Sequence, residues 1–471
     1  MSEELEWQSE NEISALIQRF EEQVKSGNGH FFDVEEFETI IDYYLDNHER
    51  TMARQAIDSA HQQHPHSSSF GIRESRLLAL ESNYDEALAI LDRLEMLEPG
   101  DEEIFFTRGE IFGMMERHED AIGEYKKLLQ TDTERMGDVL SNIAFEYESM
   151  NDFDNALKYL EKALFLQPDS DELIQEIAFF FEINHKEEEA ISFYTNFLDE
   201  HPYSPYAWFH LGIFYSTLDL YEKAIQAYEF VLAIDDGFSA AYFNMANSYS
   251  SLKQFRKAIN LYKETFKLEQ PEAITYCYIG ECYESLDDLE KALKYYNQAL
   301  EKDERLPESW SGVARIFMKQ DRNRMAVKYY QKAIELAPHQ DDIKFELGVL
   351  FLQLNEYDKA ATLFEEVVKN SKNYVEAWMN YSLIYALQGD FETAQDIMVT
   401  AIDANRDNAL LWFRQAGYFY RSGKLEDAYF HMEQAFKLDF ESHIELLDYI
   451  PELMEDHRFL EMLDLYKEPK K

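Results

Sequence analysis

The 471-residue sequence has little of what breaks helices or joins domains: 16 glycines, 10 prolines and no Ser/Gly-rich linker. Its two cysteines, Cys277 and Cys282, are five residues apart on one expected helix, a poor geometry for a disulfide. Apolar runs never approach the ~18–20 residues of a membrane span. The start, "MSEELEWQSE", lacks the basic head and apolar core of a signal peptide. These absences favour a helical, cytoplasmic protein that does not insert into membranes.

Positive charge is also scarce, with 44 basic against 93 acidic residues and a formal net charge of −49. Residues 1–204 contain 48 acidic and 15 basic residues, whereas residues 205–471 contain 45 and 29. Such a field repels nucleic acid and anionic membranes and attracts basic partners. Carboxylates also keep a long protein soluble, so the charge leaves both roles open. An aromatic content of 15% nevertheless predicts a folded chain.

One pattern recurs every 34 residues. It is visible in "DFDNALKYLEKALFLQPDS", "DLYEKAIQAYEFVLAIDDG" and "DLEKALKYYNQALEKDERL". Twelve repeats are expected over 34–442, with one extra residue in the third. They begin at residues 34, 68, 102, 137, 171, 205, 239, 273, 307, 341, 375 and 409.

The repeats share small residues at two positions. Position 20 is alanine in all twelve, from Ala53 to Ala428, and position 8 is small in eleven, with Ile41 as the exception. Two antiparallel helices that cross closely leave no room for large side chains at such positions. Each repeat is therefore expected to be two helices, A and B, joined by a tight turn. Prolines at position 32 should end helix B: Pro65, Pro99, Pro168, Pro202 and Pro338.

Large aromatic residues complete the pattern, with tryptophan frequent at position 4 and tyrosine at positions 11 and 24. The pattern W-x2-L-G-x2-Y…A-x3-Y…A…P, clearest in "AWFHLGIFYSTLDLYEKAIQAYEFVLAID", resembles the tetratricopeptide repeat (TPR). The resemblance implies an all-α, right-handed superhelical solenoid of about twelve TPR helix-turn-helix repeats plus terminal helices. A helices would line an inner groove, with B helices outside. It says little about function, because one fold serves many partners.

The resemblance also implies that positions 2, 5, 6, 9, 12 and 13 of helix A face the groove. No repeat has the position-5 lysine with which chaperone-binding members hold a peptide carboxylate. Phenylalanines and asparagines on this face offer apolar area and amide hydrogen bonds to an extended peptide; alternatively, the rings pack against neighbouring A helices. The groove candidates are Tyr206, Phe209, Phe243, Asn244, Asn247, Phe345, Asn380 and Phe413, of which the first five are the best-placed cluster.

Both ends of the chain are expected to be helical. An amphipathic helix within residues 1–33 either packs on the first repeat or detaches to bind a partner; its apolar residues are Ile13, Leu16, Ile17, Phe20 and Val24. Residues 443–471 have the spacing of a degenerate repeat or of capping helices. Their apolar residues either are buried or form a partner or dimer surface: Phe459, Leu460, Met462, Leu463, Leu465 and Tyr466.

Catalytic motifs are absent: no P-loop, nucleophile elbow or HExxH occurs, and the repeats leave no room for a catalytic domain. His61, His64 and His66 lie close in "HQQHPH", but Pro65 breaks the helix and no acidic or cysteine ligand accompanies them. Neither a metal nor another cofactor is expected. The sequence predicts a non-enzymatic scaffold that binds a peptide or protein, basic in one interpretation, and no nucleic acid. The alternatives are a chaperone or acidic decoy for a basic protein, and a regulator of a partner enzyme.

Overall fold

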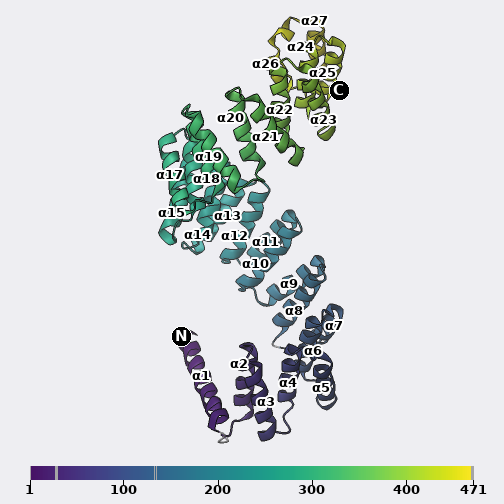
Figure 1. Cartoon of the computed structure of the whole chain (residues 1–471). Helices are drawn as coiled ribbons and strands as arrows, with labels where there is room; N and C mark the ends of the chain where they lie inside the picture. The colour runs from purple at the N-terminus through teal and green to yellow at the C-terminus, as the bar shows by residue number, and fades with distance from the viewer. Residues whose placement is uncertain (1, 27–29, 132, 134, 468–471) are drawn as a thin grey trace. The chain divides into compact units, whose positions relative to one another are not determined.

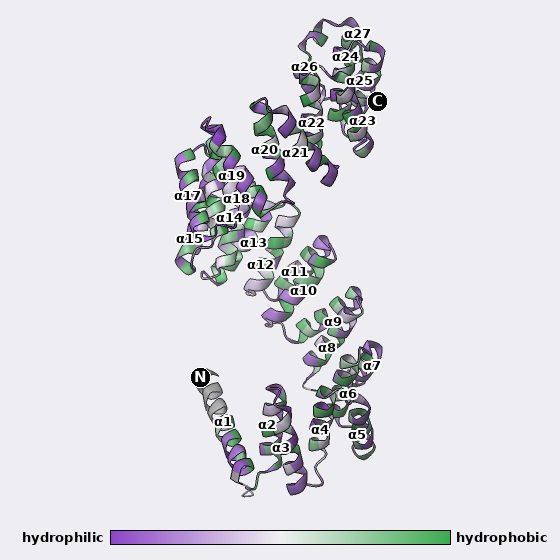
Figure 2. Ribbon diagram, in the orientation of Figure 1, coloured by the Kyte–Doolittle hydropathy of each residue, from purple (hydrophilic) through white to green (hydrophobic). Residues whose placement is uncertain are grey.

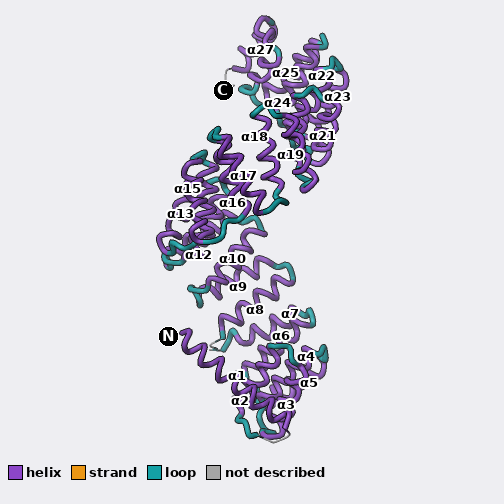
Figure 3. The backbone as a smooth tube through the Cα atoms, turned by 60° about the vertical axis from the view of Figure 1, so that its left-hand side comes forward, coloured by secondary structure: helices purple, strands orange, loops and turns teal. Residues whose placement is uncertain are grey.

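The computed structural model describes residues 2–26, 30–131, 133 and 135–467, and within these ranges every regular element is a helix (Figures 1 and 3). The predicted all-α fold is therefore confirmed. Hydrophobic and hydrophilic residues are interleaved along the helices (Figure 2), as expected of helices that bury one face and expose the other.

Twelve A helices alternate with twelve B helices along the chain. The A helices are α2 (Val34–Asp46), α4 (Ser69–Leu80), α6 (Glu102–Met114), α8 (Met136–Ser149), α10 (Asp171–Ile183), α12 (Pro205–Thr217), α14 (Ser239–Ser251), α16 (Ala273–Ser285), α18 (Pro307–Lys319), α20 (Asp341–Gln353), α22 (Val375–Leu387) and α24 (Ala409–Arg421). The B helices are α3 (Arg50–Gln63), α5 (Tyr84–Leu97), α7 (His118–Leu128), α9 (Phe153–Leu166), α11 (Glu187–Glu200), α13 (Tyr221–Ile234), α15 (Phe255–Leu268), α17 (Leu289–Lys302), α19 (Asn323–Leu336), α21 (Tyr357–Asn370), α23 (Phe391–Ala404) and α25 (Leu425–Leu438).

The helices form two compact units, residues 1–236 and residues 237–471. The first unit contains the N-terminal helix α1 (Ser2–Ser26) and the helices up to α13, and the second contains the helices from α14 onward. Within each unit, helix A packs on helix B of its own repeat, and helix B packs on helix A of the next. Each unit therefore has a core that continues from repeat to repeat.

The small residue at position 8 is explained by an aromatic ring at position 24 of the same repeat. A Cβ atom added to Gly109 would lie 2.5 Å from Cε1 of Tyr125, and one added to Gly212 would lie 2.5 Å from Cε1 of Tyr228. Both tyrosines are buried. The crowding thus comes from a ring held between the two helices, rather than from the close approach of two helices that the sequence suggested. Further examples are Gly280 with Tyr296 and Gly348 with Phe364.

A second periodic feature lies in the backbone, at position 15 of every repeat. Ten of these residues are not glycine and have φ between 52° and 65°, while Gly389 and Gly423 have φ of 80° and 79°. In the repeat that begins at residue 239, the backbone N–H of Lys253 donates to the Ser250 carbonyl oxygen, and that of Gln254 donates to the Tyr249 carbonyl oxygen. This pair of hydrogen bonds is the Schellman motif, which ends a helix on a left-handed residue. The same turn therefore separates helix A from helix B throughout.

Four tryptophans at position 4 hold the loops between repeats. The indole N–H of Trp208 donates to the Pro202 carbonyl oxygen at 2.9 Å, and that of Trp310 donates to Glu304 at 2.7 Å. Trp378 and Trp412 make the same bond to Lys372 and Arg406. In each case the acceptor lies six residues earlier, just after the preceding B helix, so these tryptophans join consecutive repeats.

The N-terminal helix α1 packs on the first repeat. Phe20 is fully buried, with its ring centroid 6.0 Å from that of Phe32 and 6.4 Å from that of Phe37. Arg19 and Glu36 form an ion pair of 2.6 Å beside it. These contacts agree with the packing interpretation of α1.

At the C-terminus, Pro451 interrupts the expected repeat. Helix α26 (His443–Tyr449) is followed by the 3-10 helix η1 (Pro451–Glu455) and by α27 (His457–Lys467). Phe459 is fully buried, whereas Leu460 and Leu465 remain 37% and 63% exposed. The apolar residues of this segment therefore divide between the core and the surface.

Candidate functional site

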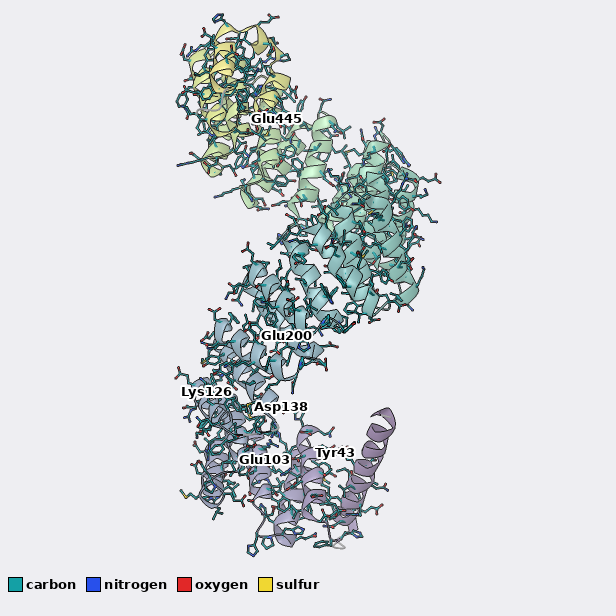
Figure 4. The ribbon with its side chains drawn as sticks, turned by 180° about the vertical axis from the view of Figure 1, so that it is seen from behind. Tyr43, Glu103, Lys126, Asp138, Glu200 and Glu445 are labelled. Carbon is teal, nitrogen blue, oxygen red and sulfur yellow. The ribbon has the colours of Figure 1, made fainter. Side chains whose placement is uncertain are left out.

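The A helices of the first unit present one row of residues at position 9, called here the position-9 row. The row consists of Asp42, Arg76, Glu110, Phe145, Phe179 and Ile213, on α2, α4, α6, α8, α10 and α12. Residues three or four positions away lie on the same helix face. The row and these neighbours form the A-helix face of the unit. Figure 4 labels Glu103 and Asp138, at position 2 of α6 and α8.

The first half of this face is hollow and charged. A cavity of about 630 Å³ is lined by residues of α2, α4 and α6: Asp42, Leu45, Asp46, His48, Arg76, Ala79, Leu80, Glu110, Ile111 and Met114. Arg76 lies 3.5 Å from a carboxylate oxygen of Glu110, and the neighbouring Arg73 lies 2.7 Å from Asp42. Burial raises the pKa of Glu110, although Arg76 opposes the shift. The hollow is therefore lined both by paired charged side chains and by apolar side chains.

The second half of the face is apolar and exposed. Phe145 is 58% exposed and Phe179 is 51% exposed, at the same position of α8 and α10. Ile183, one turn after Phe179, is 40% exposed, and Met114, at the rim of the hollow, is 50% exposed. A single exposed apolar residue on a protein surface is ordinary, but four on one face of successive helices form a patch.

Carboxylates surround these exposed rings. Glu148 lies one turn after Phe145, and Glu176 and Glu182 lie one turn before and after Phe179. Within the described ranges, none of the three forms an ion pair. Burial and the neighbouring Glu148 raise the pKa of Glu176, and burial raises the pKa of Glu182. These carboxylates lack the compensating cations that the hollow contains.

The boundary between the two units divides the cluster that the sequence predicted. Tyr206 and Phe209 belong to the first unit, where both are half-buried. The ring centroid of Phe209 lies 6.0 Å from that of Tyr228 and 5.6 Å from that of His210. Phe209 thus rests on its own repeat while part of its ring faces solvent.

The remaining members of that cluster belong to the second unit. The ring of Phe243 lies 5.7 Å from that of Tyr262 and 5.8 Å from that of Tyr278 on the next A helix, as the packing alternative expects. Asn247 accepts a hydrogen bond of 2.6 Å from the Tyr262 hydroxyl. Asn244 is half-buried. Asn247 therefore has a structural partner, and Phe243 bridges two repeats.

The other three candidates also make intramolecular contacts. Phe345 lies 5.0 Å from Tyr374 at the end of the same repeat, just before α22, measured between ring centroids. The Asn380 side chain donates to the Glu376 carbonyl oxygen of its own helix at 2.8 Å. Phe413 is only 1% exposed and packs edge-on against Phe436, so its ring belongs to the core and is not accessible to a partner.

Phe145 and Phe179 were not among the sequence candidates, although their spacing contained a usable signal. The candidates were chosen at positions 2, 5, 6 and 9; at position 5, Phe243 contacts the next repeat and Phe413 is buried. Position 9 was among the positions expected to face the groove, and Phe145 and Phe179 are exposed there. Two phenylalanines 34 residues apart at such a position are the pattern that would have indicated the patch.

In the second unit, the corresponding face carries an ion-pair network. Arg315 lies 3.1 Å from Glu284 and 3.4 Å from Glu346, and Lys319 lies 3.0 Å from Glu284. The Tyr296 hydroxyl donates to Glu284 at 2.8 Å. Burial opposes the charge of Arg315, yet Glu346 and Glu284 raise its pKa. Here the carboxylates are neutralised internally, in contrast to those beside Phe145 and Phe179.

Side chains suited to metal or redox chemistry are not gathered in the described ranges. No group of three His, Cys, Asp or Glu residues there has the geometry of a metal site. Cys277 and Cys282 are buried free thiols, and burial raises the pKa of Cys277 to about 12 and that of Cys282 to about 11. The His64 ring contacts the Phe32 carbonyl oxygen at 2.8 Å. Of the helices described, none is both long and apolar enough to span a bilayer.

Family models match residues in both units. Tetratricopeptide repeat models match residues 137–170, 205–237, 239–305 and 383–429. A model described as the cilia and flagella-associated protein 70 middle TPR-like domain matches residues 276–403.

Individual relatives are distant. An uncharacterized lipoprotein of Treponema pallidum (strain Nichols) is 22% identical over 126 residues, which are 27% of this chain and 64% of the relative, so the chain spans less than two thirds of that relative. A tetratricopeptide repeat protein of Parabacteroides merdae has a TM-score of 0.45 and 16% identity, with 53% of this chain and 99% of that chain covered. For the APC/C hetero-tetramer Cut9-Hcn1, the TM-score is 0.40 and the identity 13%, with 86% and 96% covered.

These TM-scores lie below 0.5, so the assignment depends on the family models and on the helices themselves. Three of the matches begin at the first residue of a repeat, at 137, 205 and 239. The left-handed residue at position 15 recurs with the same period. Together they show that the chain belongs to the tetratricopeptide-repeat family, whose repeats mediate protein–protein interaction.

Proposed function

We propose that this protein is a non-enzymatic scaffold that binds a peptide or protein segment along its A-helix face. The observation that carries the proposal is the hollow of about 630 Å³ on α2, α4 and α6, together with the exposed side chains of Phe145 and Phe179 at position 9 of the next two A helices. A small-molecule site is usually an enclosed, mainly apolar pocket. A hollow on α2, α4 and α6 that is rich in charge, on a face with further exposed apolar residues on α8 and α10, suits an elongated partner better.

Several sequence candidates fit this proposal as additional contacts. Tyr206 and Phe209 in the first unit are half-buried, as are Phe243, Asn244 and Phe345 in the second. Truncation of Phe209 to alanine should weaken binding if its solvent-facing edge touches the partner, because aromatic residues often dominate interface energy. The same truncation at Phe243 should also lower thermal stability, since that ring contacts two repeats.

A site-specific cross-linker tests the proposal. The two native cysteines are buried, so a single added cysteine can be labelled with a photoreactive maleimide. Met114→Cys places the label at the rim of the hollow, and Met96→Cys, at a residue that is 84% exposed on the B helix α5, is the matched control. A discrete protein from the native cell should cross-link to the Met114→Cys protein and be displaced by unlabelled protein. Equal capture by both variants, or none, would contradict the proposal.

A second candidate function is an acidic chaperone or decoy that shields a basic protein, and the unpaired carboxylates beside Phe145 and Phe179 favour it. The two functions differ in salt dependence, because charge-driven shielding weakens steeply as salt screens the carboxylates. Scaffold binding should instead follow the exposed rings and survive physiological salt. A reducing compartment such as the cytoplasm suits the buried thiols of Cys277 and Cys282.

A further inference from the structure

We propose that the partner segment held by the first unit is basic and amphipathic, and that it docks on the patch formed by α8 and α10. This α8/α10 patch consists of Phe145, Glu148, Glu176, Phe179, Glu182 and Ile183. The inference rests on the proposed function, because it specifies the chemistry of the partner and its place on the A-helix face.

The apolar part of the patch would be covered by apolar side chains of the partner. Phe145, Phe179 and Ile183 have 58%, 51% and 40% of their surface exposed. Other residues of α8 and α10 supply the side chains that these helices bury in the core of the unit. Burial of these side chains removes apolar area from water and so favours association. Aromatic rings at the centre of an interface commonly contribute most of its binding energy.

The charged part of the patch specifies the sign of the partner. Elsewhere on this face, carboxylates have cations beside them: Arg76 neighbours Glu110 at 3.5 Å, and Arg73 lies 2.7 Å from Asp42. Glu176 instead lies close enough to Glu148 for the two like charges to interact, with no cation paired to either within the described ranges. A lysine or arginine of the partner would offset this repulsion and form charge-assisted hydrogen bonds with the two carboxylates.

Charge also argues against other occupants. Residues 137–204, which contain α8 to α11, include 16 acidic and three basic residues. A second copy of this chain, a nucleic acid or an anionic membrane would bring further negative charge to the patch. A purely apolar segment would leave Glu148 and Glu176 partly desolvated without a counter-ion, which is unfavourable.

The spacing of the two phenylalanines suggests the spacing in the partner. Phe145 and Phe179 occupy the same position of A helices in consecutive repeats, and an extended chain rises about 3.3 Å per residue. Apolar residues three apart in an extended segment lie about 10 Å from one another, and we propose that they reach the two rings. The residues between them would carry the lysines or arginines that meet Glu148, Glu176 and Glu182.

Defined peptides provide the probe. Fluorescein-labelled (Leu-Lys-Lys)5 has apolar residues every third position, (Ser-Lys-Lys)5 keeps only the charge, and (Leu-Glu-Glu)5 reverses it. Fluorescence anisotropy with the full chain at physiological salt should show at least about tenfold tighter binding of (Leu-Lys-Lys)5 than of either other peptide. Equal affinity for (Ser-Lys-Lys)5 would overturn the proposal, because attraction would then need no apolar anchor.

Two variants of the protein locate the binding. The triple substitution Glu148→Gln, Glu176→Gln and Glu182→Gln removes the patch charge, and Phe145→Ser with Phe179→Ser removes its rings. Each should weaken (Leu-Lys-Lys)5 binding at least about tenfold, with the circular dichroism spectrum unchanged. The matched control is a triple glutamine substitution of exposed glutamates on the B helices α11 and α13: Glu188, Glu222 and Glu229. A control that weakens binding as much as the patch triple would overturn the proposal.

The protein captured through Met114→Cys separates this inference from the proposed function. The inference expects that protein to contain a basic segment and to lose affinity at least about tenfold for the glutamine triple of the patch. A captured protein that binds the patch variants as tightly as the wild type would refute the basic, amphipathic docking while leaving the scaffold function intact. Absence of any Met114-specific capture would instead refute the scaffold function itself.

Discussion

His210 shows how the core of the first unit sets the properties of a single residue. Its ring lies 6.2 Å from that of Tyr194 and 5.6 Å from that of Phe209, measured between centroids. Neither ring nitrogen has a hydrogen-bond partner in the described ranges. Burial lowers the pKa of His210 to about 4, so the ring is neutral at pH 7.

This neutral histidine predicts a pH dependence of stability. The unfolded chain binds a proton at His210 below about pH 6.5, whereas the folded chain stays neutral until about pH 4. The unfolded state therefore binds more protons in this window, and the stability contributed by His210 should fall by ~1–3 kcal/mol as the pH drops through it.

Urea midpoints of the wild type and of His210→Phe, measured from pH 7 to pH 4, test this dependence. The carboxylates common to both proteins contribute equally, so the difference between the two curves isolates His210. The wild type should lose stability faster as the pH falls. Parallel curves would show that the ring is not held neutral.

The glycine at position 8 predicts a packing effect. Gly212→Ala should destabilise the protein by ~1–3 kcal/mol, because its Cβ would meet the Tyr228 ring at 2.5 Å. Tyr228→Leu should relieve that crowding, so the double variant should be more stable than the sum of the single changes predicts. Urea denaturation of the wild type, the two single variants and the double variant gives the double-mutant cycle.

Gly123→Ala is the control for that cycle. It lies inside α7 with open space around the added methyl group, so the substitution should stabilise the helix by ~0.5–1 kcal/mol. Destabilisation at both glycines, or strict additivity in the cycle, would contradict the steric explanation of position 8.

At the scale of single residues, the sequence predicted which positions are small but not why, because the residue that crowds position 8 lies 16 residues later. It also missed Phe145 and Phe179. Phenylalanine on an amphipathic helix is usually part of a core, and only the direction of position 9 distinguishes these two rings from Phe413, which is buried.

At the scale of helices, the turn within each repeat is the most regular element of the structure. Residues as different as His48, Glu116, Lys253 and Asp321 adopt nearly the same left-handed conformation there. Side-chain type indicates this conformation only in part: asparagine, aspartate or glycine, which tolerate it best, occupies seven of the twelve positions. Proline, by contrast, marked the ends of B helices correctly: α9 ends at Leu166 before Pro168, since proline cannot continue a helix.

The left-handed residue predicts a stabilising substitution. Lys253 is exposed and has φ of 58°, a conformation that costs roughly 1 kcal/mol or more for a residue with a Cβ atom. Lys253→Gly should therefore raise the urea midpoint, by up to about 1 kcal/mol in stability. Lys253→Ala keeps the strained Cβ and should give no such gain. A gain of equal size in both variants would indicate an effect of the lysine charge instead.

At the scale of the whole molecule, charge differs between the two units. Residues 1–236 contain 53 acidic and 16 basic residues, and residues 237–471 contain 40 and 28. The sequence shows this difference in charge, but it does not show which carboxylates are paired with cations in the folded protein. The carboxylates around Arg315 in the second unit are neutralised by ion pairs, whereas Glu148 and Glu176 in the first unit are not. Only the folded arrangement distinguishes the two cases.

The charge distribution predicts how a basic ligand associates. Long-range attraction sums over many carboxylates, so the association rate of (Leu-Lys-Lys)5 in stopped-flow fluorescence should fall as ionic strength rises and the Debye length shortens to about 10 Å at 0.1 M. The patch triple and the B-helix control triple remove the same charge and should slow association similarly. Only the patch triple should speed dissociation, because it removes direct contacts. Equal dissociation rates for the two triples would contradict docking on the patch.

Hydrogen exchange tests most directly that this protein binds its partner on the A-helix face. Exchange is measured along the full chain with and without the protein captured through Met114→Cys. Binding should slow exchange in α6, α8 and α10, while the intervening B helices α7 and α9 remain unchanged. Protection confined to the B helices, or found only in the second unit, would contradict the account.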